Sequence, residues 1–307
     1  MEEITEKASG LVEVADKKAK GPARHGSSLE TAFGSPRDFL DNRFVYVVIS
    51  PRAQGLSVGV NMNPDRKCNL DCVYCEVDRR SPSRERILDV QLMAHELRRT
   101  LAFVQDRRLR ERPWYHNVPD ELLQLRHVAL SGDGEPTLSP HFIEAIEAVV
   151  HVRALGGLPF FKLVLITNAT GLNQPPVQRG LQLLTRQDEI WVKLDGGTQA
   201  YLNKVYRAEL PLEKILANIL ALGQQRPVII QSLFPAIHNE GPPPEEIDQY
   251  ALRLRELREH GAQIALVQIY SANRPTPHSE CGHLSLKALS RIAQTVRQVS
   301  GLKAEVF

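Results

Sequence analysis

Short apolar runs rich in β-branched residues recur along the chain from residue 43 onward. Two come early, RFVYVVIS (43–50) and SVGVNM (57–62), and a loop with a proline and a glycine separates them. Five more follow at wider spacing: HVALS (127–131), KLVLITN (162–168), EIWVKLD (189–195), PVIIQSLF (227–234) and IALVQIY (264–270). Each is almost continuously apolar, as expected for strands buried on both faces. The pattern therefore predicts a sheet built mainly from parallel strands.

Apolar residues recur at helical spacing between these runs. One series covers residues 90–104, and a second covers residues 247–257, opened by PPPEE and closed by Gly261. Ser285 is expected to cap a last helix that carries apolar positions up to Val299. Strand–helix alternation over six units predicts an α/β fold with a parallel sheet, either open or curled into a barrel.

The polar start of the chain contrasts with this alternation. Residues 1–40 have little periodicity and are expected to form a flexible N-terminal leader, with one domain over residues 41–307. The leader has no apolar core of the kind found in a signal peptide, and no apolar run approaches the ~20 residues of a membrane span. The net charge of +2 gives no case for bulk attraction to nucleic acid or membrane. We therefore expect a cytoplasmic protein.

Polar residues gather where the predicted strands end. Because the carboxyl ends of parallel strands meet at one edge of a sheet, these residues predict a site there. Polar turns after single strands would be unremarkable, but five in succession favour a site. The residues are Ser131 to Glu135, Thr167 and Asn168, Lys193 and Asp195, Gln231 and Ser232, and Gln268 with Ser271.

Three of the four cysteines lie within eight residues, in Cys68-Asn-Leu-Asp-Cys72-Val-Tyr-Cys75. Such a group in a reducing compartment is more often metal-binding or catalytic than disulfide-bonded. Thiolates suit iron–sulfur clusters and zinc. Three cysteines can hold three corners of a 4Fe–4S cubane and leave the fourth iron open, whereas a structural zinc site needs a fourth ligand from elsewhere. Both metals stay open on the spacing alone.

The C-x3-C-x2-C spacing, with an aromatic residue before the last cysteine, resembles the signature of the radical S-adenosylmethionine (radical SAM) superfamily. The segment SGDGEPTL (131–138) is similar to its Gly-Gly-Glu element, with Asp133 inserted between the glycines. With LITNAT, WVKLDGGT, VIIQSLF and VQIYSANRP following in order, the chain resembles the wyosine-synthase-like group of iron–sulfur oxidoreductases over residues 44–300.

This resemblance implies a partial (β/α)6 TIM-like barrel with parallel strands and outer helices. It implies a 4Fe–4S cluster and S-adenosylmethionine as cofactors, and reductive cleavage to a 5′-deoxyadenosyl radical that abstracts hydrogen from a substrate. The cluster ligands would be Cys68, Cys72 and Cys75. The residues that match the cofactor-binding element are Gly132, Gly134 and Glu135, with Glu135 placed to bind the α-ammonium group. Thr167 and Asn168, at the next strand end, could reach the ribose hydroxyls, although an ordinary strand-to-loop turn would also explain them.

Lys193 and Asp195 are the predicted catalytic pair, since alternate residues of a strand share one face. Substrate contact, or Schiff-base chemistry at Lys193, is weighed against a buried ion pair. Arginines at 107–112 beside Trp114 suit RNA contact but are also typical of a solvated helix end. The alternative function is a non-catalytic zinc or iron–sulfur module that recognises RNA or protein.

The expected partners are an external one-electron donor of the flavodoxin or ferredoxin type and a substrate that is RNA, a peptide or a small metabolite, with no membrane. Wyosine synthesis, as the resemblance implies, uses a second cluster that holds pyruvate. A second cubane would need about three more cysteines, and only Cys281, between His278 and His283, remains. The sequence therefore predicts a single cluster and a reaction other than wyosine synthesis.

Overall fold

The computed structural model describes residues 39–80, 83, 85–272 and 274–307. The predicted leader lies outside the described residues except for its last two positions, which belong to a short 3-10 helix, η1 (Phe39–Asp41). The predicted domain of residues 41–307 contains all the strands described below.

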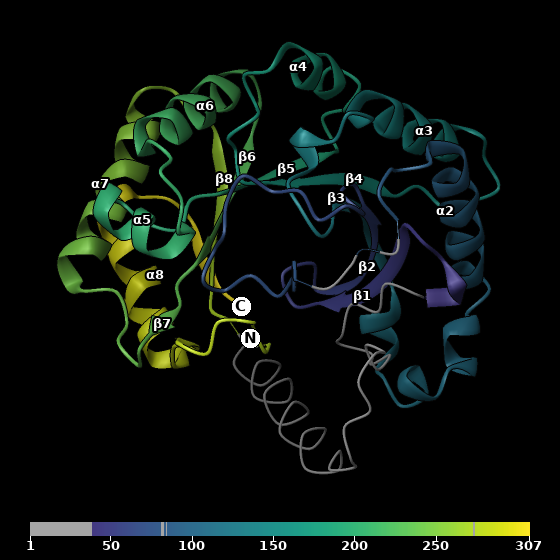
Figure 1. Cartoon of the computed structure of the whole chain (residues 1–307), viewed down its shortest axis with the longest axis horizontal. Helices are drawn as coiled ribbons and strands as arrows, with labels where there is room; N and C mark the ends of the chain where they lie inside the picture. Colours follow the sequence, from purple (N-terminus) through teal and green to yellow (C-terminus); the bar gives the residue numbers. More distant parts are fainter. Residues whose placement is uncertain (1–38, 81–82, 84, 273) are drawn as a thin grey trace.

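One curled sheet of eight strands forms the centre of the molecule, in the order β1-β2-β3-β4-β5-β6-β8-β10. Neighbouring strands from β2 to β10 are parallel, whereas β1 pairs with β2 as an antiparallel hairpin. Figure 1 shows the sheet curving around an open centre with the helices outside it. The predicted partial TIM-like barrel is therefore confirmed. The strands are β1 (Val45–Ser50), β2 (Gly55–Asn61), β3 (Leu125–Ser131), β4 (Lys162–Thr167), β5 (Glu189–Lys193), β6 (Val228–Leu233), β8 (Ile264–Tyr270) and β10 (Ala304–Val306).

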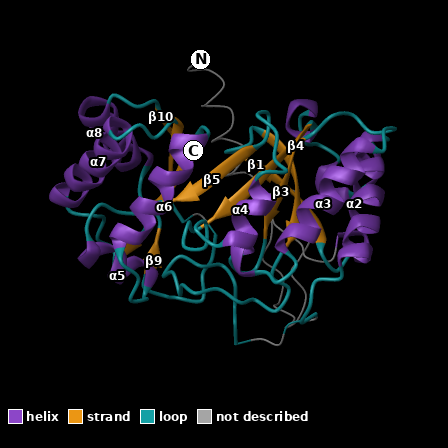
Figure 2. Cartoon of the chain, turned by 90° about the horizontal axis from the view of Figure 1, so that it is seen from above, coloured by secondary structure: helices purple, strands orange, loops and turns teal. Residues whose placement is uncertain are grey.

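Helices lie on the convex side of the sheet, and Figure 2 shows the same arrangement from above. The three helices expected from apolar spacing are present as α2, α7 and α8, and Ser285 caps α8 by accepting a hydrogen bond from the backbone N–H of Ala288. The α-helices are α2 (Val90–Gln105), α3 (Phe142–Ala154), α4 (Pro175–Leu181), α5 (Gln199–Tyr206), α6 (Leu212–Gln225), α7 (Pro244–Glu259) and α8 (Leu286–Ser300). Further 3-10 helices are η2 (Arg108–Glu111), η3 (Pro113–Tyr115), η4 (Asp120–Leu123) and η5 (Pro136–Leu138).

The two faces of the sheet differ in chemistry. Side chains on the convex face, such as Leu130 and Leu165, are fully buried beneath the helices. On the concave face, the ring of His127 on β3 meets that of Trp191 on β5 with centroids 5.2 Å apart, although β4 lies between the two strands. The concave side of a curved sheet brings the side chains of alternate strands closer together than a flat sheet does. Polar side chains of the strands are thus gathered inside the curve.

Three short strands were not predicted. β7 (Ala236–Ile237) and β9 (Cys281–Gly282) form a separate two-stranded antiparallel sheet, and β10 adds to the edge of the large one. Each has only two or three residues, which is too short to show an alternating pattern. Within the described residues, no helix combines the length and the apolar character that a membrane crossing requires.

Candidate functional site

The three clustered cysteines lie on the loop that follows β2, here called the cysteine loop (residues 62–80). Backbone hydrogen bonds hold this loop at both ends. The N–H of Glu135, after β3, donates to the carbonyl of Lys67 at 3.1 Å. On the other side, the N–H groups of Asp71 and Val73 donate to carbonyls in the last turn of α5, at 2.9 and 2.8 Å. The loop therefore crosses from the carboxyl end of β3 to the last turn of helix α5.

All three thiols are half-buried, and Cys68 lies within electrostatic reach of the other two. Burial, joined for Cys72 by the charge of Asp195, raises the pKa of Cys68, Cys72 and Cys75. A charge on Cys75 also raises the pKa of Cys68, and a charge on Cys68 raises that of Cys72, so the sulfurs lie within electrostatic reach of each other. Thiolates in this setting need a compensating positive charge, which a bound metal supplies.

This donor set fits an iron–sulfur cluster, because three soft thiolates on one loop can occupy three corners of a cubane. Within the part of the chain that the structure describes, no three His, Cys, Asp or Glu side chains converge where a single metal ion could bind. A cubane distributes its thiolates over separate irons and requires a wider arrangement than one ion.

Glu135 is the centre of a buried hydrogen-bond network. Its Oε1 accepts from the backbone N–H and hydroxyl of Thr137, at 3.1 and 2.7 Å, and from the hydroxyl of Thr167 at 2.5 Å. Its Oε2 accepts from the backbone N–H of Asn168 at 2.7 Å. Burial raises the pKa of Glu135, the hydrogen bonds lower it, and burial prevails. The carboxylate joins the end of β3 to the end of β4.

Asn168 carries this network onward to the cysteine loop. Its Nδ2 donates to Asn69 Oδ1 at 2.9 Å and lies 3.9 Å from the sulfur of Cys68. Asn69 in turn donates to the hydroxyl of Thr170 at 3.0 Å. The predicted residues Thr167 and Asn168 are thus brought together with Glu135 and the first cysteine, and both side chains are engaged within the protein.

The two glycines of the Gly-Gly-Glu-like segment lie where side chains would collide with the backbone. A Cβ on Gly134 would come within 1.9 Å of the carbonyl oxygen of Lys67. Gly132 has φ of 132°, and a Cβ there would be 2.2 Å from Asn61 Oδ1. The inserted Asp133 accepts from Asn61 Nδ2 at 2.8 Å and donates its N–H to Asn61 Oδ1 at 3.0 Å. Asn61 was missed from the sequence, and its position at the end of a strand was the available signal.

Lys193 and Asp195 meet near the cysteine loop. Lys193 Nζ is 3.4 Å from Asp195 Oδ2, 3.2 Å from the hydroxyl of Tyr270 and 4.8 Å from the ring centre of Tyr74. The Tyr74 hydroxyl donates to the same Asp195 oxygen, and the backbone N–H of Leu233 donates to the other at 2.7 Å. Burial lowers the pKa of Lys193, but Asp195 and Tyr270 raise it by more, so the ammonium form is favoured.

Tyr74 and Tyr270 are functional candidates that the sequence did not single out as site residues. Tyr74 was visible only as the aromatic position of the cysteine motif, and Tyr270 only as the end of an apolar run. Nothing local in the sequence indicates that both would contact the same lysine, because 196 residues separate them (270 − 74).

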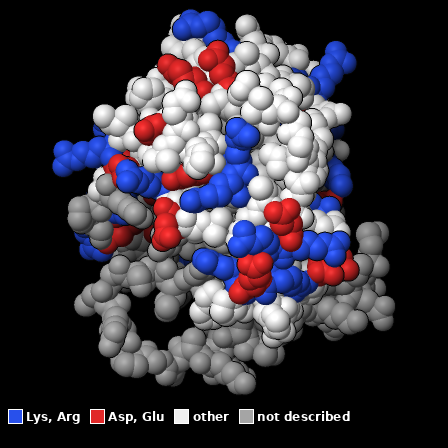
Figure 3. All heavy atoms as spheres, turned by 90° about the vertical axis from the view of Figure 1, so that its right-hand side faces the viewer, with Lys and Arg blue, Asp and Glu red and all other residues white. Residues whose placement is uncertain are grey.

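The basic segment 107–112 does not form a uniform surface. Arg108 pairs with Glu111 at 3.2 Å, and Trp114 is half exposed rather than packed. Figure 3, which views the side of α2 and α3, shows Lys and Arg interspersed with Asp and Glu. Cys281 lies in β9, apart from the three clustered thiols in sequence, and is half-buried.

Comparison with known proteins places this geometry in context. No family model matches the sequence. The UPF0026 protein slr1464 of Synechocystis sp. is 32% identical over 188 residues, which cover 59% of this chain. The chain spans 60% of the length of that curated relative.

Two solved structures are similar over most of the chain. A radical SAM methyltransferase from Sphaerobacter thermophilus has 17% identity and a TM-score of 0.58, covering 86% of this chain and 68% of that one. TYW1, solved with a lysine-pyruvate adduct bound, has 15% identity and a TM-score of 0.53, covering 85% of this chain and 86% of that one. The chain has the radical SAM fold. The resemblance seen in the motifs is thereby confirmed at the level of the fold, while the roles of individual site residues stay predictions.

Proposed function

We propose that the chain is a radical SAM enzyme that holds a 4Fe–4S cluster on Cys68, Cys72 and Cys75. Such a cluster, when bound, supplies the electron that splits S-adenosylmethionine into methionine and a 5′-deoxyadenosyl radical, which takes hydrogen from the substrate. Catalysis by the protein then consists of positioning, since the cofactor carries the bond-breaking chemistry.

One observation carries this proposal. The chain of hydrogen bonds from Glu135 through Asn168 to Asn69 joins the Gly-Gly-Glu-like segment, the end of β4 and the cysteine loop. Three motifs that the superfamily resemblance singles out, far apart in sequence, therefore meet at the carboxyl edge of the sheet. In parallel α/β folds this edge is where active sites lie.

The protein's own residues have distinct tasks in this proposal. Gly134 lets the backbone approach Lys67 closely, which fixes the cysteine loop against β3. Glu135 retains lone-pair capacity on Oε2, which accepts a hydrogen bond from the N–H of Asn168, and there it can also accept from the cofactor's ammonium group. Thr167 and Asn168 hold that carboxylate in place and so act on the cofactor indirectly.

Lys193 is proposed to hold an anionic or polar group of the substrate as an ammonium ion. Asp195 and Tyr270 favour the charged form of Lys193, and Tyr74 lies over it. An amine that attacks a carbonyl must first lose its proton. The surroundings therefore favour electrostatic contact over the covalent alternative in this chain.

An external donor is proposed to deliver the electron. Flavodoxins and ferredoxins are acidic, and Arg80 at the end of the cysteine loop has a side chain that is 81% exposed, although it pairs with Asp78 at 3.1 Å. A cytoplasmic location is proposed because free thiols and thiolate-bound clusters persist in reducing compartments. The substrate is proposed to be RNA, a peptide or a small metabolite.

The test starts with anaerobically reconstituted protein. We expect a brown protein that absorbs near ~400 nm and that, after reduction, releases 5′-deoxyadenosine from S-adenosylmethionine. The Cys68, Cys72 and Cys75 triple alanine variant should lose iron, sulfide and this product, whereas Cys281→Ala should keep all three. A colourless zinc protein, or full iron in the triple variant, would refute the proposal and favour the non-catalytic alternative.

A further inference from the structure

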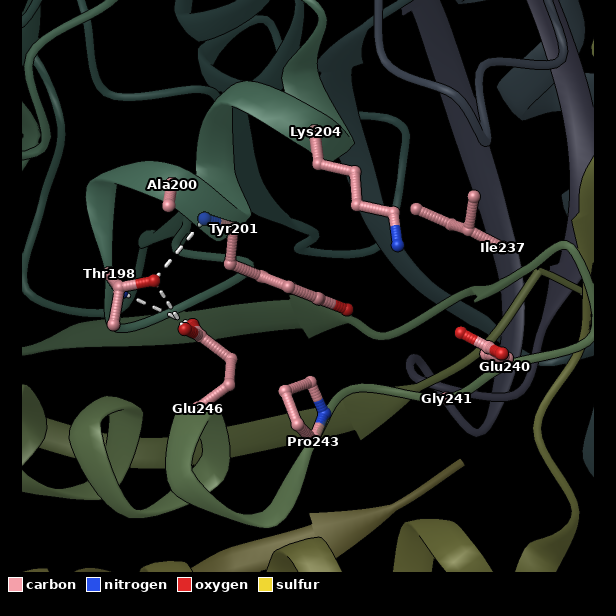
Figure 4. Close-up of a pocket in the computed structure, with 9 residues that line it drawn as sticks. All are labelled: Thr198, Ala200, Tyr201, Lys204, Ile237, Glu240, Gly241, Pro243 and Glu246. Atoms are coloured by element: carbon pink, nitrogen blue, oxygen red, sulfur yellow. Dashed lines mark hydrogen bonds between the residues drawn. The ribbon is translucent and has the colours of Figure 1, made fainter.

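A pocket with a volume of about 290 Å³ lies between α5 and the start of α7. Its walls come from one face of α5, from the hairpin that follows β7 and from the residues that open α7. Figure 4 shows the lining side chains, which are Thr198, Ala200, Tyr201, Lys204, Ile237, Glu240, Pro243 and Glu246. The volume is at the lower end for small-molecule sites and suits a compact ligand.

The pocket presents opposite charges from different walls. Lys204 extends from α5 toward the space, and the carboxylate of Glu240 faces it from the hairpin (Figure 4). No ion pair within 4.0 Å joins these two groups, and among the described residues neither has another ion-pair partner. A cation and an anion that face one space without neutralising each other leave room for a ligand that carries both charges.

Tyr201 adds a directed polar group. Its side chain is 9% exposed, and its hydroxyl has no hydrogen-bond partner among the described residues. Figure 4 shows this hydroxyl pointing into the pocket, toward the space between Lys204 and Glu240. A buried hydroxyl is normally hydrogen-bonded, so a missing partner indicates where a ligand atom belongs.

The other acidic residue of the pocket already accepts hydrogen bonds from the protein on both carboxylate oxygens. Glu246 Oε1 accepts from the N–H groups of Gly197 and Thr198, at 2.5 and 3.2 Å, and Oε2 accepts from the hydroxyl of Thr198 at 2.5 Å. This carboxylate thus neutralises the N-terminus of α5. The free positive charge in the pocket is left to Lys204, and the free negative charge to Glu240.

We propose that this pocket binds a free α-amino acid with a small apolar side chain. The ligand carboxylate pairs with Lys204 and accepts a hydrogen bond from Tyr201, while the ammonium group pairs with Glu240. Ala200, Ile237 and Pro243 supply the apolar surface for the side chain.

The pocket is separate from the cysteine loop but shares a helix with it. The last turn of α5 accepts the backbone hydrogen bonds of the loop through the carbonyls of Val205 and Tyr206, whereas the pocket uses Ala200, Tyr201 and Lys204. A ligand in the pocket therefore contacts the helix that holds the loop. This inference does not depend on cluster chemistry.

The test uses the full chain with its cluster and L-leucine as the probe, followed by calorimetry and ligand-observed NMR at low salt, because exposed charges are screened by ions. We expect saturable binding of leucine. 4-Methylpentanoate, which lacks the ammonium group, and 3-methylbutylamine, which lacks the carboxylate, should each bind at least about tenfold more weakly, because each loses one charge-assisted contact.

Variants locate the site. Lys204→Met, Glu240→Gln and Tyr201→Phe should each weaken leucine binding, the first two by about tenfold. The matched controls Lys214→Met on α6 and Glu245→Gln on α7, both exposed and outside the lining, should leave it unchanged. Melting temperatures would show that every variant is folded.

Three outcomes would overturn the inference: no saturable leucine binding, equal binding of the singly charged analogues, or loss of leucine when S-adenosylmethionine is added. The last would place leucine at the cofactor site. Cluster loading and 5′-deoxyadenosine release are measured separately from leucine binding. A lack of leucine binding would therefore not contradict the proposed function, and a lack of cluster or product would not contradict leucine binding.

Discussion

At the scale of single residues, Glu135 carries more of the site than its place in a short motif suggests. Its carboxylate accepts four hydrogen bonds, from Thr137, Thr167 and Asn168, and is almost fully buried. Superfamily resemblance assigns the same group to the cofactor's ammonium. The structure adds a role in holding two strand ends together, so a substitution here affects both stability and cofactor binding.

Glu135→Gln is expected to lower both the stability of the protein and its affinity for S-adenosylmethionine. One amide oxygen can replace Oε1, but the amide nitrogen cannot accept the N–H of Asn168, which leaves two donors facing each other. A buried donor without an acceptor costs about 1–3 kcal/mol, and binding of S-adenosylmethionine should weaken about tenfold or more. Chemical denaturation and equilibrium dialysis measure the two effects. Glu144→Gln, on the exposed side of α3, is the control, and equal behaviour of the two variants would contradict the assignment.

The sequence predicted the pair of Lys193 and Asp195 but not the other residues around it. Alternation along a strand predicted both side chains on one face. The strand β5 ends at Lys193, so Asp195 lies in the segment after it, and the two charged groups are nevertheless 3.4 Å apart. Alternation could not show that Tyr74 and Tyr270 would complete the group, or that the neighbours of Lys193 would favour its charged form.

At the scale of elements, the cysteine loop is stabilised by its neighbours rather than by regular structure of its own. It hydrogen-bonds to the segment after β3 through Lys67, to the end of β4 through Asn69, and to α5 through Asp71 and Val73. Arg79 also donates to the carbonyl of Leu70 within the loop, at 2.7 Å. These hydrogen bonds hold the backbone around the three cysteines without a bound metal.

Gly134→Ala tests this attachment. The added Cβ would meet the Lys67 carbonyl at 1.9 Å, so the cysteine loop must move away from β3. We expect a marked fall in iron retained after reconstitution, with a smaller loss of thermal stability, because the sheet itself is unaffected. Gly282→Ala is the control, since its Cβ would find only ordinary contacts, the nearest at 3.7 Å. The measurement is the iron content of both variants. Full iron in Gly134→Ala would show that the close contact between Gly134 and Lys67 is not needed for iron binding.

At the scale of the whole molecule, polar side chains lie on the concave face of the curled sheet. His127 and Trp191 meet inside it, and Gln231 donates to Gln268 at 3.0 Å across β6 and β8. TYW1, solved with a lysine-pyruvate adduct bound, is similar with a TM-score of 0.53, but at 15% identity that likeness extends to the fold alone. A shared fold does not fix a substrate.

The number of clusters is the property by which we predict that this chain differs from a wyosine synthase. We predict about four irons per chain and no tricyclic product from pyruvate and N1-methylguanosine tRNA, since a second cubane needs about three further thiolates. After the first three cysteines only Cys281 remains in the sequence. Iron analysis with the tRNA assay provides the measurement. About eight irons per chain together with a pyruvate-dependent product would contradict this prediction.

Sequence alone predicted the seven longer strands, helices α2, α7 and α8, the Ser285 cap and the order of the motifs, because apolar periodicity and turn residues act over a few neighbouring positions. Ser285 at the start of α8 and the apolar stripe of α2 are examples. It also indicated which strand ends would carry polar chemistry, since all parallel strands end at one edge.

Tertiary structure decided what those strand ends do together. Glu135 meets Asn168, Lys193 meets Tyr270, and α5 holds the cysteine loop on one side while lining a pocket on the other. These contacts join residues that are 33 to 135 positions apart (168 − 135 and 206 − 71). No local pattern encodes such distances, because they depend on how the sheet curls and on which face each helix turns inward.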